Sequence, residues 1–156
     1  MKYREMAGEK ISVLGFGCMR FPTTSKNAED IDAEKSAKML VYAIENGVNY
    51  FDTAYVYHGG KSESFIGGVL KPYRDKIHIA TKCPIWEVKC EEDFDRLLNE
   101  QLERLQTDYI DFYLMHALDK DRFKNVVEKF NLIDKLNKAK ADGKIRHIGF
   151  SFHDDV

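Results

Sequence analysis

Hydrophobic residues along this chain form two kinds of pattern, which alternate regularly. Short continuous apolar runs predict strands over residues 11–16, 48–52, 77–81, 109–115 and 145–151. Stretches with apolar residues three and four positions apart predict helices over residues 32–46, 62–70, 91–105 and 123–141. Because strands alternate with helices, we expect an α/β fold whose strands are parallel and are joined by crossover helices.

Residues at the ends of two of these helices support their boundaries. Asp30 or Asp32 is placed to cap the helix over residues 32–46, and Gly47 follows where a left-handed residue commonly ends a helix. The helix over residues 91–105 opens with acidic residues, which the helix dipole favours in the first turn: Glu91, Glu92 and Asp93.

The order of elements fits two architectures. A doubly wound open sheet needs strands in a shuffled order, and its dinucleotide-binding form carries a G-x-G-x-x-G motif after a strand. Neither that motif nor a P-loop is present, which weakens this alternative. A (β/α)8 barrel needs eight units and about 250 residues. If the fold is a barrel, the five predicted strands make a little over half of it.

Charge and length exclude several classes of protein. Lys and Arg total 24 and Asp and Glu total 26, so the net charge is −2, which gives no electrostatic footprint for nucleic acid or an anionic membrane. The longest apolar runs, about six residues, are too short for a transmembrane helix. The charged N-terminus lacks the apolar region of a signal peptide. The length predicts one domain over residues 1–156, with no second domain.

The cysteines indicate a reducing compartment. Cys18, Cys83 and Cys90 are too few, and odd in number, for a disulfide framework, so we expect a cytoplasmic protein. The spacing of Cys83 and Cys90 fits no standard zinc pattern, and no metal site is predicted.

Polar side chains stand where the predicted strands end. Asp52, Lys82 and His116 follow three successive strands, and Tyr57 lies in the loop after Asp52. Because ligands bind at the carboxyl ends of parallel strands, we expect these residues on one rim. An ammonium beside a phenol favours the phenolate, a carboxylate holds the ammonium in place, and a histidine orients a carbonyl oxygen. This combination predicts a proton donor for a small carbonyl substrate, with the hydride coming from a nicotinamide cofactor.

Several stretches resemble one known family when taken in order. The chain is similar to the N-terminal part of the aldo-keto reductases over nearly its whole length, in the segments at residues 13–20, 49–54, 81–82, 111–116 and 143–151. The resemblance implies a nicotinamide-dependent oxidoreductase whose fold is a (β/α)8 TIM barrel, so we expect this chain to form a partial (β/α)8 TIM barrel of about five parallel β/α units. It also implies that the family's catalytic tetrad corresponds to Asp52, Tyr57, Lys82 and His116. Tyr57 would be the general acid, tuned by Lys82 and Asp52, and His116 would orient the carbonyl.

The resemblance also implies where a cofactor binds. Gly17, Cys18 and Met19 match a loop that approaches the cofactor, and Ser151 matches a contact to the nicotinamide carboxamide. The cofactor would be NADP or NAD, with NADPH favoured. Phe152 stands where family members commonly have Asn. The segment 149–154 is similar to a branch with a C-terminal iron–sulfur module, whose cysteine cluster this sequence does not contain. A cluster is therefore expected only in a further C-terminal region.

A non-enzymatic alternative follows from the partial barrel. Five parallel strands taken from a barrel leave two exposed edges, which invite self-association. The alternative is a catalytically inactive fragment that acts as a binding or self-assembling module and keeps the tetrad as a relic. Cofactor binding distinguishes this alternative from the reductase.

Overall fold

The computed structural model describes residues 1–153 and contains a five-stranded parallel sheet. Its strands occur in sequence order: β3 (Phe16–Gly17), β4 (Tyr50–Asp52), β5 (His78–Cys83), β6 (Ile110–Leu118) and β7 (Ile145–Phe152). Each strand lies beside its neighbour in the chain, which is the order of a barrel, whereas an open doubly wound sheet reverses direction at a switch point. The prediction of an α/β partial barrel is confirmed.

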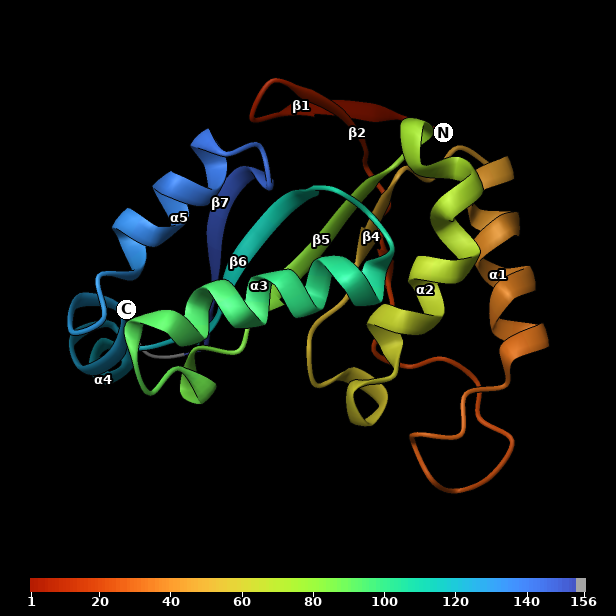
Figure 1. Ribbon diagram of the computed structural model, residues 1–156. Coiled ribbons are helices and arrows are strands. Elements are labelled where there is room, and N and C mark those ends of the chain that lie inside the picture. The colour runs from red at the N-terminus through yellow and green to blue at the C-terminus, as the bar shows by residue number, and fades with distance from the viewer. Residues whose placement is uncertain (154–156) are drawn as a thin grey trace.

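Four longer helices cover one face of the sheet (Figure 1): α1 (Ala33–Glu45), α2 (Ser62–Leu70), α3 (Glu91–Leu105) and α5 (Leu132–Ala141). Shorter helical segments connect them to the strands: η1 (Tyr57–Gly60), η2 (Lys71–Lys76), η3 (Ile85–Glu87), α4 (Lys120–Arg122) and η4 (Phe123–Glu128). None of the helices in residues 1–153 has the length and apolar character needed to cross a bilayer.

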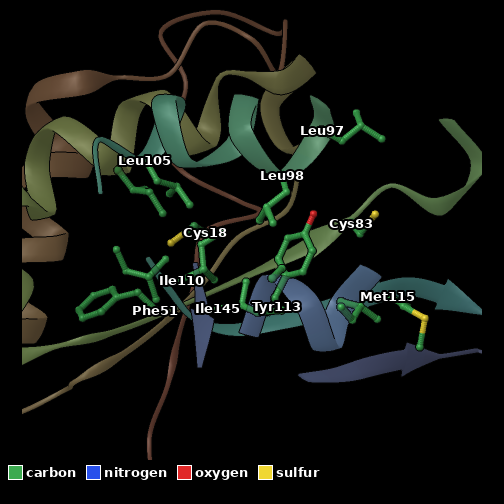
Figure 2. Packing of buried hydrophobic residues seen from close by; sticks show 14 of the residues in the cluster. Cys18, Phe51, Cys83, Leu97, Leu98, Leu105, Ile110, Tyr113, Met115 and Ile145 are labelled. Carbon is green, nitrogen blue, oxygen red and sulfur yellow. The ribbon is translucent and has the colours of Figure 1, made fainter. Parts of the chain in front are cut away.

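The core lies between the sheet and these helices. Figure 2 shows α3 placing Leu98 and Leu105 over side chains from the strands, among them Ile110 and Tyr113. These side chains are almost fully removed from solvent. The apolar spacing of α3 thus has the burial pattern that its sequence predicts, and α2 and α3 have the predicted bounds.

The predicted boundary signals of α1 are present. Asp32 caps the helix, because its Oδ1 accepts a hydrogen bond from the Lys35 amide at 3.0 Å. Gly47 follows the helix with φ +86°, a left-handed conformation that suits glycine. Of the two aspartates considered from the sequence, Asp32 is therefore the cap.

The predicted strand over residues 11–16 is wrong. Its first two residues end β2 (Glu9–Ser12), which pairs antiparallel with β1 (Tyr3–Met6), and only the two residues of β3 join the parallel sheet. Figure 1 shows this hairpin lying across one end of the sheet. The Asn49 side chain holds it there, since its Oδ1 accepts from the Ser12 amide and its Nδ2 donates to the Lys10 carbonyl.

The predicted helix over residues 123–141 is also wrong, because it is broken. The segment consists of η4, which is π-helical, and α5, separated at Asn131. Asn131 adopts φ +52°, a left-handed conformation that ends a right-handed helix and that asparagine tolerates better than most residues. The periodicity on either side is helical, so the pattern alone does not reveal the break.

Both edges of the sheet are free of strand partners among the described residues. On β7 the exposed side chains include Ile148, Phe150 and Phe152, and two of these line an apolar groove of about 610 Å³ together with Phe123 and Ile133. Self-association through these edges stays a prediction, as does the assignment of residues 1–156 to a single domain.

The contact between α2 and α3 depends on Gly67. A Cβ atom at this position would lie 2.4 Å from the Arg104 carbonyl oxygen. Because backbone must move to relieve this overlap, we expect Gly67→Ala to lower the free energy of unfolding by about 1–3 kcal/mol. Gly68→Ala is the matched control, since its Cβ meets only the Gln106 side chain at 3.7 Å.

Urea unfolding checks this prediction. In the control, alanine favours the helix by about 0.5–1 kcal/mol, so Gly68→Ala should be as stable as the parent or more so. Equal free energies of unfolding for Gly67→Ala and Gly68→Ala would contradict the requirement for glycine where α2 approaches α3.

Candidate active site

The four predicted catalytic residues lie at the carboxyl end of the sheet. Asp52 ends β4, Lys82 is near the end of β5, His116 is in the last part of β6, and Tyr57 begins η1. Parallel pairing brings the strand ends together, and the Lys82 Nζ lies 2.7 Å from Asp52 Oδ1 and 3.3 Å from Tyr57 Oη. The structure therefore brings the predicted set to one place, while the roles of its members stay predictions.

Lys82 is held by three acceptors. Besides Asp52 and Tyr57, its ammonium donates to the Thr53 carbonyl at 2.7 Å. An ammonium has three N–H donors, so these acceptors use all of them. The Tyr57 oxygen accepts from Lys82, which leaves the phenolic hydrogen available to another acceptor.

His116 packs between two aromatic rings. Its ring centroid lies 5.1 Å from that of Trp86 and 6.3 Å from that of Tyr57. Burial, followed by the positive charge of Lys82, lowers the pKa of His116 to about 4. The imidazole is therefore neutral near pH 7. Within residues 1–153 its Nδ1 is buried and meets no hydrogen-bond partner.

The predicted cofactor residues differ in exposure. Met19 is 54% exposed, and open space lies where a Cβ would extend from Gly17. The Cys18 side chain is instead fully buried in the core, and burial raises the pKa of its thiol well above the usual range. Ser151 lies beside the end of β6, where its Oγ accepts a hydrogen bond from the Ala117 amide at 2.7 Å. The structure thus does not bring the Cys18 side chain to the rim.

Two further residues contact the site but were not predicted from the sequence. Ser62, at the start of α2, donates to the Cys18 carbonyl and lies 2.9 Å from the Thr53 hydroxyl, so it links the Gly17–Met19 loop to the residue that binds Lys82. Gln101 donates to the Lys82 carbonyl from α3. The available signal for Gln101 was its place on the apolar stripe of the predicted helix, where a polar residue is unusual.

No group of three or more His, Cys, Asp or Glu side chains in the described part of the chain is arranged to hold a metal ion. The titratable groups at this rim are instead the ion pair of Lys82 with Asp52, the phenol of Tyr57 and the neutral imidazole of His116. Together they can hold a carbonyl oxygen and give it a proton.

Relatives of this chain are oxidoreductases by name. "Probable aldo-keto reductase 1" of Glycine max is 32% identical over 153 residues, which cover 92% of this chain and 42% of the relative. L-galactose dehydrogenase of Arabidopsis thaliana is 32% identical over 151 residues, which cover 92% of this chain and 46% of the relative. The chain therefore spans about half the length of the curated relatives that it matches.

Solved structures agree with this similarity. The holo form of an aldo-keto reductase from Bacillus halodurans has a TM-score of 0.80 at 31% identity, covering 97% of this chain and 50% of that one. An aldo-keto reductase from Klebsiella pneumoniae in complex with NADPH has a TM-score of 0.74 at 27% identity, and the match covers 93% of this chain and 47% of that one. The model of the aldo/keto reductase family matches residues 13–156. This chain belongs to the aldo/keto reductase family.

Proposed function

We propose that this chain provides the proton-donating site of a reductase that converts an aldehyde or ketone to an alcohol. The observation that carries the proposal is the arrangement around Lys82, whose ammonium is fixed by Asp52 and Thr53 and contacts the Tyr57 oxygen at 3.3 Å. An ammonium in this position stabilises the phenolate that forms when the tyrosine gives up its proton.

Each of the four side chains has a role in this proposal. A nicotinamide cofactor, when bound, supplies the hydride that adds to the carbonyl carbon. Tyr57 donates its proton to the carbonyl oxygen, so hydride and proton together complete the alcohol. Lys82 stabilises the resulting phenolate, and Asp52 keeps Lys82 in place. His116, neutral near pH 7, donates a hydrogen bond to the carbonyl oxygen without competing as an acid.

The residues at the rim fit such a cofactor. The open space beside Gly17 lets a bound molecule approach the backbone closely, and the Met19 side chain is exposed, so both residues can contact such a molecule. The Ser151 oxygen already accepts from Ala117, which leaves its hydroxyl hydrogen free to donate to a carboxamide oxygen. Cys18 would act only through its backbone. NADPH is favoured over NADH because a similar solved structure is a complex with NADPH. An iron–sulfur cluster concerns only a further C-terminal region and stays a prediction.

Native mass spectrometry of the chain, with NADPH or NADH added, tests the proposal. We expect one cofactor per site and tighter binding of NADPH. The same spectra report whether the 18.1 kDa chain associates with further copies. With benzaldehyde as the probe, the cofactor-binding species should then consume reduced cofactor and release benzyl alcohol. Cofactor binding without turnover would contradict the proposed reaction, and failure to bind either cofactor would favour the inactive binding or assembly module.

A further inference from the structure

Gln101 is a buried polar residue on the apolar face of α3. It is fully removed from solvent, and the other buried residues of this helix are apolar: Phe94, Leu97, Leu98 and Leu105. Burying an amide is unfavourable unless its hydrogen bonds are satisfied. The partners of Gln101 therefore indicate what this residue does.

The carbonyl group of Lys82 has no strand to pair with. In β5, the Ala80 carbonyl accepts from the Thr53 amide, so carbonyls two residues apart face the β4 side. The Lys82 carbonyl is the next on that side, but β4 ends at Asp52, which pairs with Ala80. The Gln101 Nε2 replaces the missing strand, since it lies 3.1 Å from the Lys82 carbonyl oxygen.

Surrounding side chains fix the orientation of the Gln101 amide. Its Oε1 accepts from the Tyr113 hydroxyl at 2.7 Å, and Figure 2 shows this hydroxyl pointing from the sheet toward α3. The Gln101 Nε2, on the other side of the amide, donates to Glu63 Oε1 at 2.6 Å. A reversed amide would place its oxygen against the Glu63 carboxylate and the Lys82 carbonyl, so only one orientation satisfies the set.

Glu63 anchors this network from α2. Its carboxylate also accepts from the Thr81 hydroxyl at 2.6 Å, and the Arg104 guanidinium lies 3.4 Å away. Every partner donates to Glu63. Burial raises the pKa of this carboxyl group, and the hydrogen bonds from Thr81 and Gln101 oppose that rise. The Gln101 amide is thus held by the buried Glu63 side chain and in turn holds the Lys82 carbonyl near the end of β5.

We propose that Gln101 is a positioning residue of the candidate active site, which fixes the end of β5 so that the Lys82 ammonium reaches Asp52, Thr53 and Tyr57 at once. The inference rests on the proposed function in treating Lys82 and Tyr57 as the reacting pair. The contact of Lys82 with Tyr57, at 3.3 Å, is the longest of the three. A small displacement of the strand end would break it first.

The ammonium signal of Lys82 in a proton–nitrogen correlation spectrum tests this proposal without cofactor or turnover. An ammonium held by three acceptors exchanges its hydrogens slowly, and Lys82→Arg identifies its signal. In Gln101→Met, which keeps the bulk but removes the hydrogen bonds, we expect the exchange rate to rise by about tenfold, the scale of one or two lost buried hydrogen bonds. Leu136→Ala is the control for general loss of stability, because Leu136 is a buried residue of another helix.

Tyr113→Phe provides a second variant should Gln101→Met fail to fold. It removes only the hydroxyl that orients the Gln101 amide, and a smaller rise in exchange rate is expected. An unchanged Lys82 signal in the folded variants, or an equal change in Leu136→Ala, would overturn the proposal. Failure of the proposed function would instead appear as loss of cofactor binding or turnover in the parent chain, with the Lys82 result unaffected.

Discussion

Tyr57→Phe is expected to lower kcat for carbonyl reduction by about 10²–10⁴-fold, because the variant lacks the proton that the carbonyl oxygen must receive. The ring remains, so its contact with the His116 ring at 6.3 Å should persist. Cofactor binding should therefore be unchanged. Turnover of benzaldehyde by the cofactor-binding species, with the cofactor Kd measured in parallel, checks both parts of this result.

Tyr55→Phe is the matched control for this substitution. Tyr55 lies two residues before Tyr57, but its hydroxyl donates to Glu100 at 3.3 Å and its ring lies under the Arg104 guanidinium. Within residues 1–153 the Lys82 ammonium donates to Asp52, Thr53 and Tyr57, and not to Tyr55. Removing the Tyr55 hydroxyl should therefore leave kcat unchanged. Turnover retained by Tyr57→Phe would remove Tyr57 from the role of general acid.

Asp111→Asn is expected to destabilise the chain by about 3 kcal/mol, the lower end of the cost of removing one partner from a buried ion pair. Asp111 is 1% exposed, and its carboxylate accepts from Arg74 at 2.6 Å and from the Ile79 amide at 2.9 Å. Arg146 approaches the same carboxylate at 3.3 Å. The substitution keeps the shape of the side chain but leaves Arg74 without its counter-charge. We expect the Tm to fall by about 6–12 °C.

The effect of Asp111 should depend on pH. Burial raises the pKa of Asp111, but the nearby His78 imidazole, the hydrogen bond from the Ile79 amide and the charge of Arg74 outweigh this effect, so the pKa lies below its ordinary value of 3.8. The unfolded chain then takes up this proton at a higher pH than the folded chain. The stabilisation is therefore complete above the ordinary value and is lost as the pH falls through the lower folded value.

Unfolding of the parent and of Asp111→Asn over a series of pH values measures this dependence. The difference in free energy of unfolding should be greatest near neutral pH and should shrink in acid. Asp95→Asn is the control, because the ion pair of Asp95 with Lys135 lies at the surface and contributes about 0–1 kcal/mol. A difference between parent and Asp111→Asn that stays constant down to acid pH would refute the assignment of the effect to the Asp111 charge.

Much of the site was accessible from the sequence because its residues lie where strands end. The alternating pattern indicated parallel strands, and parallel pairing places their carboxyl ends on one rim. Asp52, Lys82 and His116 could therefore be predicted to lie together before their distances were known. The period of the apolar residues predicted the α/β class, because it reports which face of each element is buried. The choice of a partial barrel came from the family resemblance.

The elements that were mispredicted depend on contacts with distant residues. Residues 11–16 have the composition of one strand, but the Asn49 side chain draws their first part into a hairpin across the end of the sheet. The helix over residues 123–141 has an uninterrupted apolar pattern, yet it breaks at Asn131. Apolar periodicity carries no information about either the distant hydrogen bonds or the backbone angle of one residue.

The sequence by itself therefore determined the class of fold, the order of strands and the rim on which the candidate catalytic residues lie. Tertiary structure alone decided which side chains support them. Gln101 can reach the Lys82 carbonyl because β4 ends at Asp52, and the Cys18 thiol lies in the hydrophobic core rather than on the rim. Such roles depend on several elements meeting at one point, whereas local spacing records only how each element is built.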